Sequence, residues 1–332
     1  MARSGQTNPI FMTPNRYSVT FTAFALSALA VFAINPPSLT QAEVYGLVKT
    51  GAGSPSVQTQ GPRPGKILPE PGNPKLPSLF LIGDSTVRNG EGDGATGQWG
   101  WGDPIADYFN PTKINVANRA LGGLSSRTYL TFGYWDRLLG MLKPGDFVIM
   151  QFGHNDSGPI NDNLRARGTI KGTGEETREI DNILTGKHEV VHTYGWYLRK
   201  FIADTLAKGA TPIVSSPVPR KVWQDGKINS NADDYGRWAA QVAESAGVRF
   251  VPLNTIVSRK YEELGPDKVE PLFSGDHTHT SLAGAELNAA SVIAGLKALK
   301  KNPLARYFSE RAKSVAKAKP GAIGSSSLDR SR

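Results

Sequence analysis

The chain has 332 residues, no cysteine and a formal net charge of +9. Without cysteine it has no disulfide, no thiolate metal site and no cysteine nucleophile. The positive charge is confined to the ends of the chain: residues 1–42 carry +2, residues 43–77 carry +2, residues 311–332 carry +5, and residues 78–310 are neutral. This distribution argues against a nucleic-acid partner for the middle of the chain.

The first 42 residues have the composition of an export signal. Two arginines come before or beside an apolar stretch over 19–34, and small residues follow up to Ala42. This order predicts a cleavable signal peptide over 1–42 and a secreted or periplasmic protein, with a single membrane anchor as the alternative. Since no other segment is apolar enough to span a bilayer, we expect no stable membrane insertion after cleavage.

The remaining composition divides the chain into a linker, one domain and a tail. Residues 43–77 are rich in glycine, proline, serine and glutamine and predict a linker, whereas residues 311–332 predict a basic disordered tail. Strands and helices alternate over 78–310, which predicts an α/β domain with a parallel sheet covered on both faces. The predicted strands are 78–83, 114–118, 146–152, 211–216 and 249–253. The predicted helices are 103–109, 131–142, 189–208, 231–246 and 281–300.

The first predicted strand ends at Gly83-Asp84-Ser85. A buried parallel strand that stops at a serine places that residue at the sheet edge where open α/β proteins bind their ligands. Most such serines are turn residues, and this segment is not the Gly-x-Ser-x-Gly elbow of ordinary α/β-hydrolases, because Val87 occupies the last position. Ser85 is a candidate nucleophile because the chain also contains a candidate base and candidate oxyanion donors, in two polar segments further along the sequence.

Asp276 and His279 lie three residues apart in a polar loop just before the predicted helix 281–300. A serine hydroxyl needs a base to take its proton, and that base needs a carboxylate to fix its tautomer. The spacing allows one loop to present both groups and predicts His279 as the base and Asp276 as its partner. His277 is the competing base, and helix capping by Asp276 is the non-catalytic alternative.

Asn155 follows the predicted strand 146–152, and Gly123 lies in a Gly-Gly turn after the strand 114–118. Acyl transfer builds negative charge on a carbonyl oxygen, which donors already aimed at that position stabilise. The backbone N–H groups of Ser85 and Gly123 and the side-chain amide of Asn155 are the predicted donors. Ordinary turns are the alternative for Gly123 and Asn155.

Taken in order, Ser85, Gly123, Asn155 and His279 resemble the four blocks of the SGNH hydrolase superfamily, also called the GDSL family. The sequence of these motifs, over residues 78–300, is most similar to the rhamnogalacturonan acetylesterase branch. The segments that carry the resemblance are Gly83-Asp84-Ser85-Thr86, Gly100-Trp101-Gly102, Gly123-Leu124-Ser125-Ser126-Arg127, Gly153-His154-Asn155-Asp156 and Asp276-His277-Thr278-His279-Thr280-Ser281.

The resemblance implies a flavodoxin-like, three-layer α/β/α sandwich around a five-stranded parallel sheet, with no metal and no organic cofactor. It implies that Ser85 is the nucleophile and first oxyanion donor and that Gly123 and Asn155 are the other donors. It also implies that His279 is the base and Asp276 its partner. The chain departs from the branch at Leu124, where an arginine is common, and in a long polar insertion over 161–187 that could reshape one wall of the cleft.

Four further residues are candidates for substrate contact. Trp99 and Trp101 lie on a Gly-rich loop and predict flat apolar faces for a sugar ring, with a role in the core as the alternative. Arg127 and Arg220 are candidate contacts for uronate carboxylates, and ordinary surface ion pairs are the alternative.

Two groups of residues suggest a metal. The segment from His188 to His192 matches the H-E-x-x-H motif of zinc peptidases, but the predicted helix 189–208 would turn both histidines away from its apolar face, and no third ligand follows. His154 and Asp156 could join Asp276 as ligands, although no run of ligands supports such a site. We therefore predict no metal.

Together these features predict an exported serine esterase that removes O-acetyl groups from pectic polysaccharide (rhamnogalacturonan) through an acyl-enzyme intermediate. The expected partner is an acetylated polysaccharide or oligosaccharide, and the expected oligomeric state is a monomer. The alternatives are an acetylxylan esterase or another carbohydrate or lipid esterase of the same superfamily, a zinc peptidase, and a non-catalytic carbohydrate-binding relative.

Overall fold

The computed structural model describes residues 65–229 and 232–319. The predicted signal peptide, most of the predicted linker and the end of the predicted tail therefore lie outside the described residues. Within the part of the chain that is described, no helix is both long enough and apolar enough to cross a membrane.

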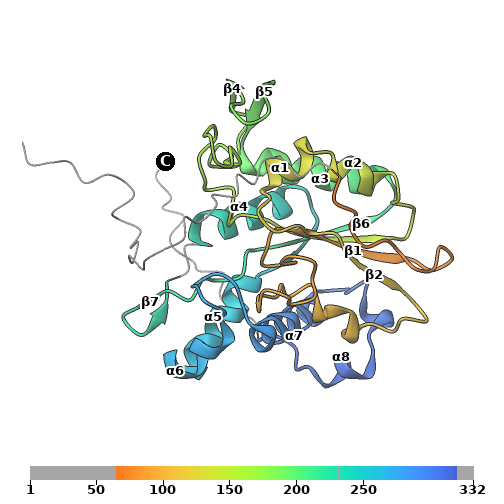
Figure 1. Cartoon of the computed structure of the whole chain (residues 1–332). Coiled ribbons are helices and arrows are strands. Elements are labelled where there is room, and N and C mark those ends of the chain that lie inside the picture. Colours follow the sequence, from red (N-terminus) through yellow and green to blue (C-terminus); the bar gives the residue numbers. More distant parts are fainter. Residues whose placement is uncertain (1–64, 230–231, 320–332) are drawn as a thin grey trace, which may run out of the picture. The chain divides into compact units, whose positions relative to one another are not determined.

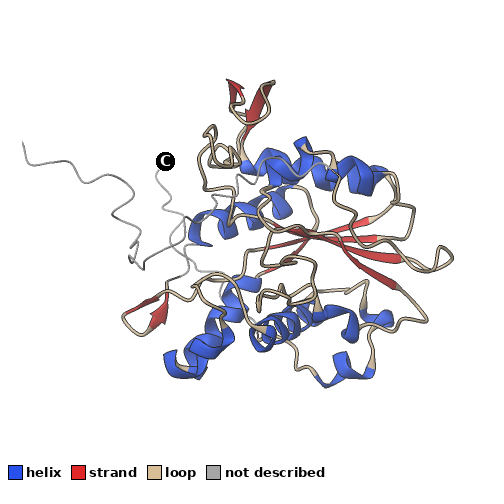
Figure 2. Ribbon diagram, viewed as in Figure 1, coloured by secondary structure: helices blue, strands red, loops and turns tan. Residues whose placement is uncertain are grey.

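A parallel sheet of five strands lies at the centre of the described domain (Figure 2). Its strands are β1 (Ser78–Gly83), β2 (Asn115–Asn118), β3 (Phe147–Gln151), β6 (Thr211–Ser215) and β9 (Arg249–Val251). Their order is β2-β1-β3-β6-β9, and every neighbouring pair is parallel. The five predicted strands are confirmed, and this order is the flavodoxin-like one, which places a ligand-binding crevice between β1 and β3.

Helices cover both faces of the sheet and form two separate cores (Figure 1). Successive side chains of β1 point to opposite faces, so that Leu79 and Leu81 join one core and Phe80 and Ile82 the other. Burial on both faces explains why β1 reads as a continuous apolar run. One core is covered by α1 (Ser126–Thr131), α2 (Tyr134–Leu139), α3 (Tyr194–Ala207) and α4 (Ala232–Ser245). The other is covered by the 3₁₀ helix η1 (Pro104–Tyr108), α5 (Leu253–Leu264), α7 (Leu282–Ala298) and α8 (Glu310–Ser314).

The predicted helix 189–208 is wrong in its first turn. Residues His188–His192 form strand β5, which pairs with β4 (Thr177–Asp181) in an antiparallel hairpin. Helix α3 begins only at Tyr194, after Thr193, whose hydroxyl accepts the Trp196 N–H as an N-cap. The apolar pair of the strand continues the helical pattern by chance, so that the two elements read as one.

Helices α1 and α5 and the hairpins were not among the predicted elements. The second hairpin consists of β7 (Trp223–Gln224) and β8 (Lys227–Ile228). Three short helices complete the described chain: α6 (Pro266–Val269), η2 (Glu270–Leu272) and η3 (Ala305–Tyr307).

The packed domain extends beyond its predicted limits of 78 and 310. At the N-terminal side, Leu68 is buried, and the Arg119 guanidinium donates to the carbonyl oxygens of Leu68 and Pro69. At the C-terminal side, α8 buries Ala312, and the Lys297 ammonium donates to the Ala312 carbonyl oxygen at 2.8 Å. The end of the predicted linker and the start of the predicted tail thus belong to the domain, because long-range contacts offset their polar composition.

Candidate active site

Ser85, His279 and Asp276 form a hydrogen-bonded chain. The Ser85 Oγ lies 2.8 Å from the His279 Nε2, and the His279 Nδ1 lies 2.6 Å from the Asp276 Oδ2. Ser85 lies two residues after the end of β1, whereas the other two residues come from the loop before α7, in which His279 is 194 positions away from Ser85 in sequence. The folded chain therefore brings together the predicted nucleophile, base and carboxylate.

The second oxygen of Asp276 organises the loop that carries His279. The Asp276 Oδ1 accepts the backbone N–H groups of Thr278 and His279, each at 2.7 Å. Burial raises the pKa of the Asp276 carboxyl, but the hydrogen bonds from His279 and from these N–H groups outweigh it and hold the pKa below its usual value. The competing base His277 faces Arg220 instead, with its Nε2 accepting from that guanidinium at 3.4 Å.

The predicted oxyanion donors lie around Ser85. A Cβ added at Gly122 would lie 3.4 Å from the Ser85 Cβ, so the Gly122-Gly123 turn passes close to the nucleophile. Gly123 has a φ of +86°, a conformation that favours glycine. The Asn155 side-chain amide donates one hydrogen to the Leu124 carbonyl oxygen at 2.7 Å, and an amide has a second hydrogen to offer.

Asp84 and His154 connect the loops that carry Ser85 and Asn155. Asp84 is fully buried; its Oδ1 accepts from Thr86, and its Oδ2 lies 3.2 Å from the His154 Nδ1. The other ring nitrogen of His154 lies 3.0 Å from the Val218 carbonyl oxygen. Burial raises the pKa of Asp84, but the His154 partner and the Thr86 bonds outweigh it and lower the pKa. This pair was not predicted from the sequence, although each residue is adjacent to a predicted site residue.

The two tryptophans have different environments. Trp101 is fully buried, and its indole N–H donates to the Gln151 Oε1 at 2.8 Å, so the prediction that it contacts a sugar is wrong. Trp99 is half-buried and exchanges two hydrogen bonds with Thr280, the residue after His279. Trp99 therefore lies beside the triad loop and remains a candidate for sugar contact.

The prediction that Arg127 contacts substrate is also wrong. Its side chain is fully buried and forms a bidentate ion pair with Glu189, with both N–O distances 2.7 Å. The remaining nitrogen donates to the carbonyl oxygens of Ile160 and Gly168. Arg127 thus holds the insertion against α1, and its complete burial keeps it away from a ligand.

The H-E-x-x-H segment does not form the zinc site of a peptidase. On strand β5, alternate residues share a face, so that Glu189 turns toward Arg127 while the two histidines lie on the opposite face. His192 stacks on Trp196, with their ring centroids 3.7 Å apart, and His188 is exposed. Among the described residues, no group of three or more His, Cys, Asp or Glu side chains is arranged to hold a metal ion.

The insertion places another arginine beside the predicted oxyanion turn. Leu124, at the position where an arginine is common in the resembling branch, is buried in the core. Arg167 approaches the same turn from the insertion and donates to the Gly123 carbonyl oxygen at 2.9 Å. Burial lowers the pKa of this guanidinium to about 10. The insertion thus places a positive charge beside the predicted oxyanion turn, and no local sequence motif predicted it.

Asp156 is a buried carboxyl behind the site. Its Oδ1 accepts the backbone N–H and the hydroxyl of Ser126 at 3.1 and 2.5 Å, whereas its Oδ2 has no hydrogen-bond partner in the described part of the chain. Burial, together with the nearby charge of Asp84, raises the pKa of Asp156 to about 7. The folded protein therefore binds a proton here that the unfolded chain, with an ordinary carboxyl pKa, releases near pH 4.

This difference makes the stability of the protein depend on pH. Because the folded state holds the extra proton, the contribution is fully present below about pH 4 and is lost as the pH rises to about 7. Because the pKa of Asp156 is about 4 in the unfolded chain and about 7 in the folded protein, the free energy of unfolding should decrease by an amount on the order of 4 kcal/mol as the pH rises between these two values. We expect Asp156→Asn, which keeps the acceptor for Ser126, to flatten this part of the pH profile in urea unfolding. Equal slopes in the wild type and the variant would contradict this prediction.

Comparison with known proteins agrees with the site. The model of the GDSL-like lipase/acylhydrolase family matches residues 81–287. A rhamnogalacturonan acetylesterase from Emericella nidulans is 34% identical over 213 residues, which cover 64% of this chain and 81% of that protein. A Bacillus subtilis protein named "Probable rhamnogalacturonan acetylesterase YesY" is 32% identical over 67% of this chain and 93% of its own length. The crystal structure of the Bacillus subtilis protein YxiM matches with a TM-score of 0.55 and 25% identity, covering 67% of this chain and 56% of that one.

The α/β/α fold, with a serine hydrogen-bonded to a histidine that is in turn hydrogen-bonded to a carboxylate, has the features of a carboxylic ester hydrolase. The chain belongs to the GDSL-like lipase/acylhydrolase family. The predicted resemblance to the SGNH superfamily and to its rhamnogalacturonan acetylesterase branch is confirmed.

Proposed function

We propose that this protein is an exported serine esterase that removes O-acetyl groups from a pectic polysaccharide of the rhamnogalacturonan type. The observation that carries the proposal is the unbroken chain from Ser85 through His279 to Asp276, with hydrogen bonds of 2.8 and 2.6 Å. The names of the two relatives supply the substrate class. Export follows from the composition of residues 1–42, and we expect the mature protein to be a monomer.

The first half of the reaction forms an acetyl-enzyme. As the Ser85 Oγ bonds to the acetyl carbonyl carbon, its proton moves to the His279 Nε2, and the ionised Asp276 stabilises the imidazolium that results. The oxyanion accepts hydrogen bonds from the Ser85 and Gly123 N–H groups and the free hydrogen of the Asn155 amide. The bond between the carbonyl carbon and the sugar oxygen then breaks, and His279 returns its proton to that oxygen.

The second half of the reaction releases acetate. A water molecule takes the place of the sugar hydroxyl, gives one proton to His279 as its oxygen bonds to the acetyl carbon, and forms a second oxyanion in the same site. When the bond to the Ser85 Oγ breaks, His279 returns the proton to the serine. The same three donors thus serve both steps.

The alternative substrates within this family are acetylated xylan and other carbohydrate or lipid esters. A panel that measures acetate release from acetylated pectin, acetylated xylan and a long-chain ester separates them. We expect the highest kcat/KM on the pectic substrate and no loss of activity with a strong chelator. Preference for xylan or for the long-chain ester would overturn the substrate class, and complete inactivity toward esters would favour a non-catalytic carbohydrate-binding role.

A further inference from the structure

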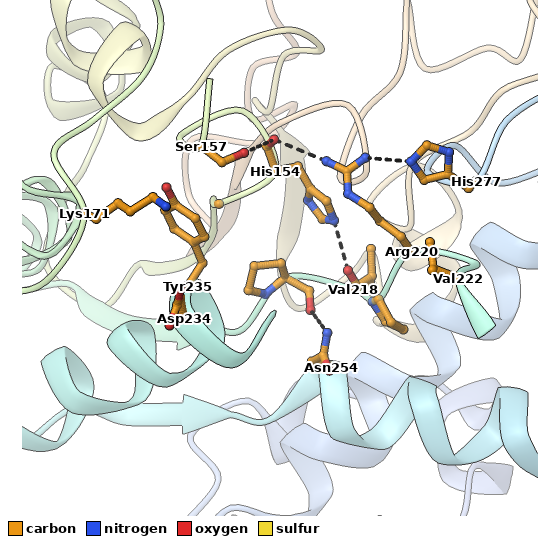
Figure 3. A pocket seen from close by; sticks show the side chains of 13 residues that line it. His154, Ser157, Lys171, Val218, Arg220, Val222, Asp234, Tyr235, Asn254 and His277 are labelled. Atoms are coloured by element: carbon orange, nitrogen blue, oxygen red, sulfur yellow. Dashed lines mark hydrogen bonds between the residues drawn. The ribbon is translucent and has the colours of Figure 1, made fainter. Parts of the chain in front are cut away.

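A pocket of about 550 Å³ is lined in part by His277, from the loop that carries Asp276 and His279 (Figure 3). His154 and Ser157 reach it from the segment after β3, Arg220 from the segment after β6, Lys171 from the insertion, and His277 from the triad loop. Its volume is within the range of roughly 300–1,000 Å³ that is typical of small-molecule sites. The pocket adjoins the triad loop, because His277 lines it and Arg220 donates to the Thr278 hydroxyl, next to His279.

Arg220 forms one wall of the pocket and has no carboxylate partner. Its guanidinium donates to the Thr278 hydroxyl, to the His277 Nε2 at 3.4 Å and to the His154 carbonyl oxygen at 3.4 Å, all of which are uncharged acceptors. Among the described residues, no Asp or Glu oxygen forms an ion pair with it. Burial lowers the pKa of Arg220, and the charges of Asp84 and Asp276 offset this in part. A half-buried guanidinium whose direct hydrogen-bond partners are all uncharged can form a stronger, charge-assisted hydrogen bond with an anion.

Lys171 contributes a second cation. It lines the pocket from the insertion, and the described part of the chain shows no ion pair or hydrogen bond of its ammonium. In Figure 3 Lys171 and Arg220 come from opposite sides of the pocket. Two unpaired cations thus face the same space.

The acidic groups close to the pocket are already engaged. Asp234, the acid that lines it, accepts from the Arg237 Nη2 at 2.9 Å. Asp84 is bound to His154, and Asp276 belongs to the triad. Arg220 and Lys171 are therefore the lining cations without a salt bridge in the described part of the chain.

We propose that this pocket is a subsite for the carboxylate of a sugar acid next to the acetylated residue, with Arg220 and Lys171 as its ligands. The proposal rests on the proposed function, since a galacturonan carries a carboxylate on each galacturonic acid residue. It predicts a preference for acidic over neutral polymers that arises in a site separate from the acyl-transfer groups. An arginine can bind a carboxylate with two parallel hydrogen bonds, whereas a lysine adds a more flexible point charge.

The first experiment compares an acetylated galacturonate oligosaccharide with the same molecule after its carboxyl groups have been reduced to alcohols. We expect the wild type to have at least tenfold higher kcat/KM on the acidic form. Lys171→Met should lower the ratio of acidic to neutral kcat/KM about fivefold, mainly through KM. Arg220→Gln should lower the same ratio about tenfold or more, because it removes a charge-assisted hydrogen bond from a half-buried site.

Lys187→Met is the matched control, since Lys187 is exposed on the same insertion and lies outside the residues that line the pocket. It should leave both rates unchanged. Equal rates of the wild type on the two substrates, or equal losses on both in the Lys171 and Arg220 variants, would overturn the subsite.

A binding measurement separates this proposal from the proposed function. Calorimetry of unacetylated galacturonate oligomer with Ser85→Ala requires no turnover, and Lys171→Met in that background should weaken binding. Binding of the oligomer by an enzyme that hydrolyses only small esters would support the subsite and reject the pectic substrate. Acetate release from pectin without oligomer binding would support the pectic substrate and reject the subsite. Displacement of the oligomer by an equal concentration of inorganic phosphate would also overturn the sugar-acid assignment, because it would mark a general anion site.

Discussion

Ser85→Ala is expected to lower kcat for 4-nitrophenyl acetate on the order of 10⁶-fold, since removal of a triad nucleophile has this effect in serine hydrolases. The side chain is small and nearly buried, and its hydrogen bond to His279 is the one interaction that the substitution removes in the described structure. The thermal midpoint should therefore change little. Steady-state kinetics and thermal unfolding of the same preparation test both parts.

Covalent labelling provides the control for Ser85. A serine-directed phosphonate should add one adduct to the wild type and none to the variant, as measured by intact mass. Ser245→Ala, at the end of α4, changes an exposed serine away from the sheet edge and should be labelled like the wild type. Retention of substantial activity in Ser85→Ala, or labelling at a different residue, would reject Ser85 as the nucleophile.

Asp276→Asn is expected to lower kcat on the order of 10⁴-fold. The variant keeps an Oδ1 that can accept the Thr278 and His279 N–H groups, so the loop should retain its shape. Its amide, however, presents N–H donors to the His279 Nδ1 in place of the carboxylate oxygen. That favours the tautomer with the proton on Nε2, which cannot accept the Ser85 proton.

Asp267→Asn is the matched control for Asp276, because Asp267 is an exposed carboxylate on α6. It should have wild-type kinetics. The crystal structure of Asp276→Asn would show whether the loop is preserved. A loss of less than tenfold with the loop in place would mean that Asp276 organises the backbone without orienting the base.

Features that depend on neighbours along the chain could be predicted well. The buried strands β1, β3 and β6 read as apolar runs because both of their faces are covered, and Ser85 and Asn155 follow β1 and β3 at the sheet edge. The contact between Asp276 and His279 is local, since three residues separate them in one loop. The family resemblance then ordered these local signals into one site.

The errors occur where two different structures share one local pattern. The apolar residues of β5 continue the period of α3, so a strand and a helix read as a single helix. Trp99 and Trp101 lie in the same Gly-rich segment, but only Trp101 is buried in the core, where its indole N–H donates to Gln151 of β3. Nothing close in sequence distinguishes them.

Long-range partners also determine what each charged residue does. Arg127 and Arg220 were equivalent candidates, yet Arg127 is neutralised by Glu189, 62 positions away, whereas Arg220 has uncharged partners and faces a pocket. The local sequence was thus enough to locate the strands and the candidate acyl-transfer residues, because periodicity and short spacings specify them. The folded chain was needed to show which cations remain free to bind substrate, because burial and counter-ions come from segments far apart in the sequence.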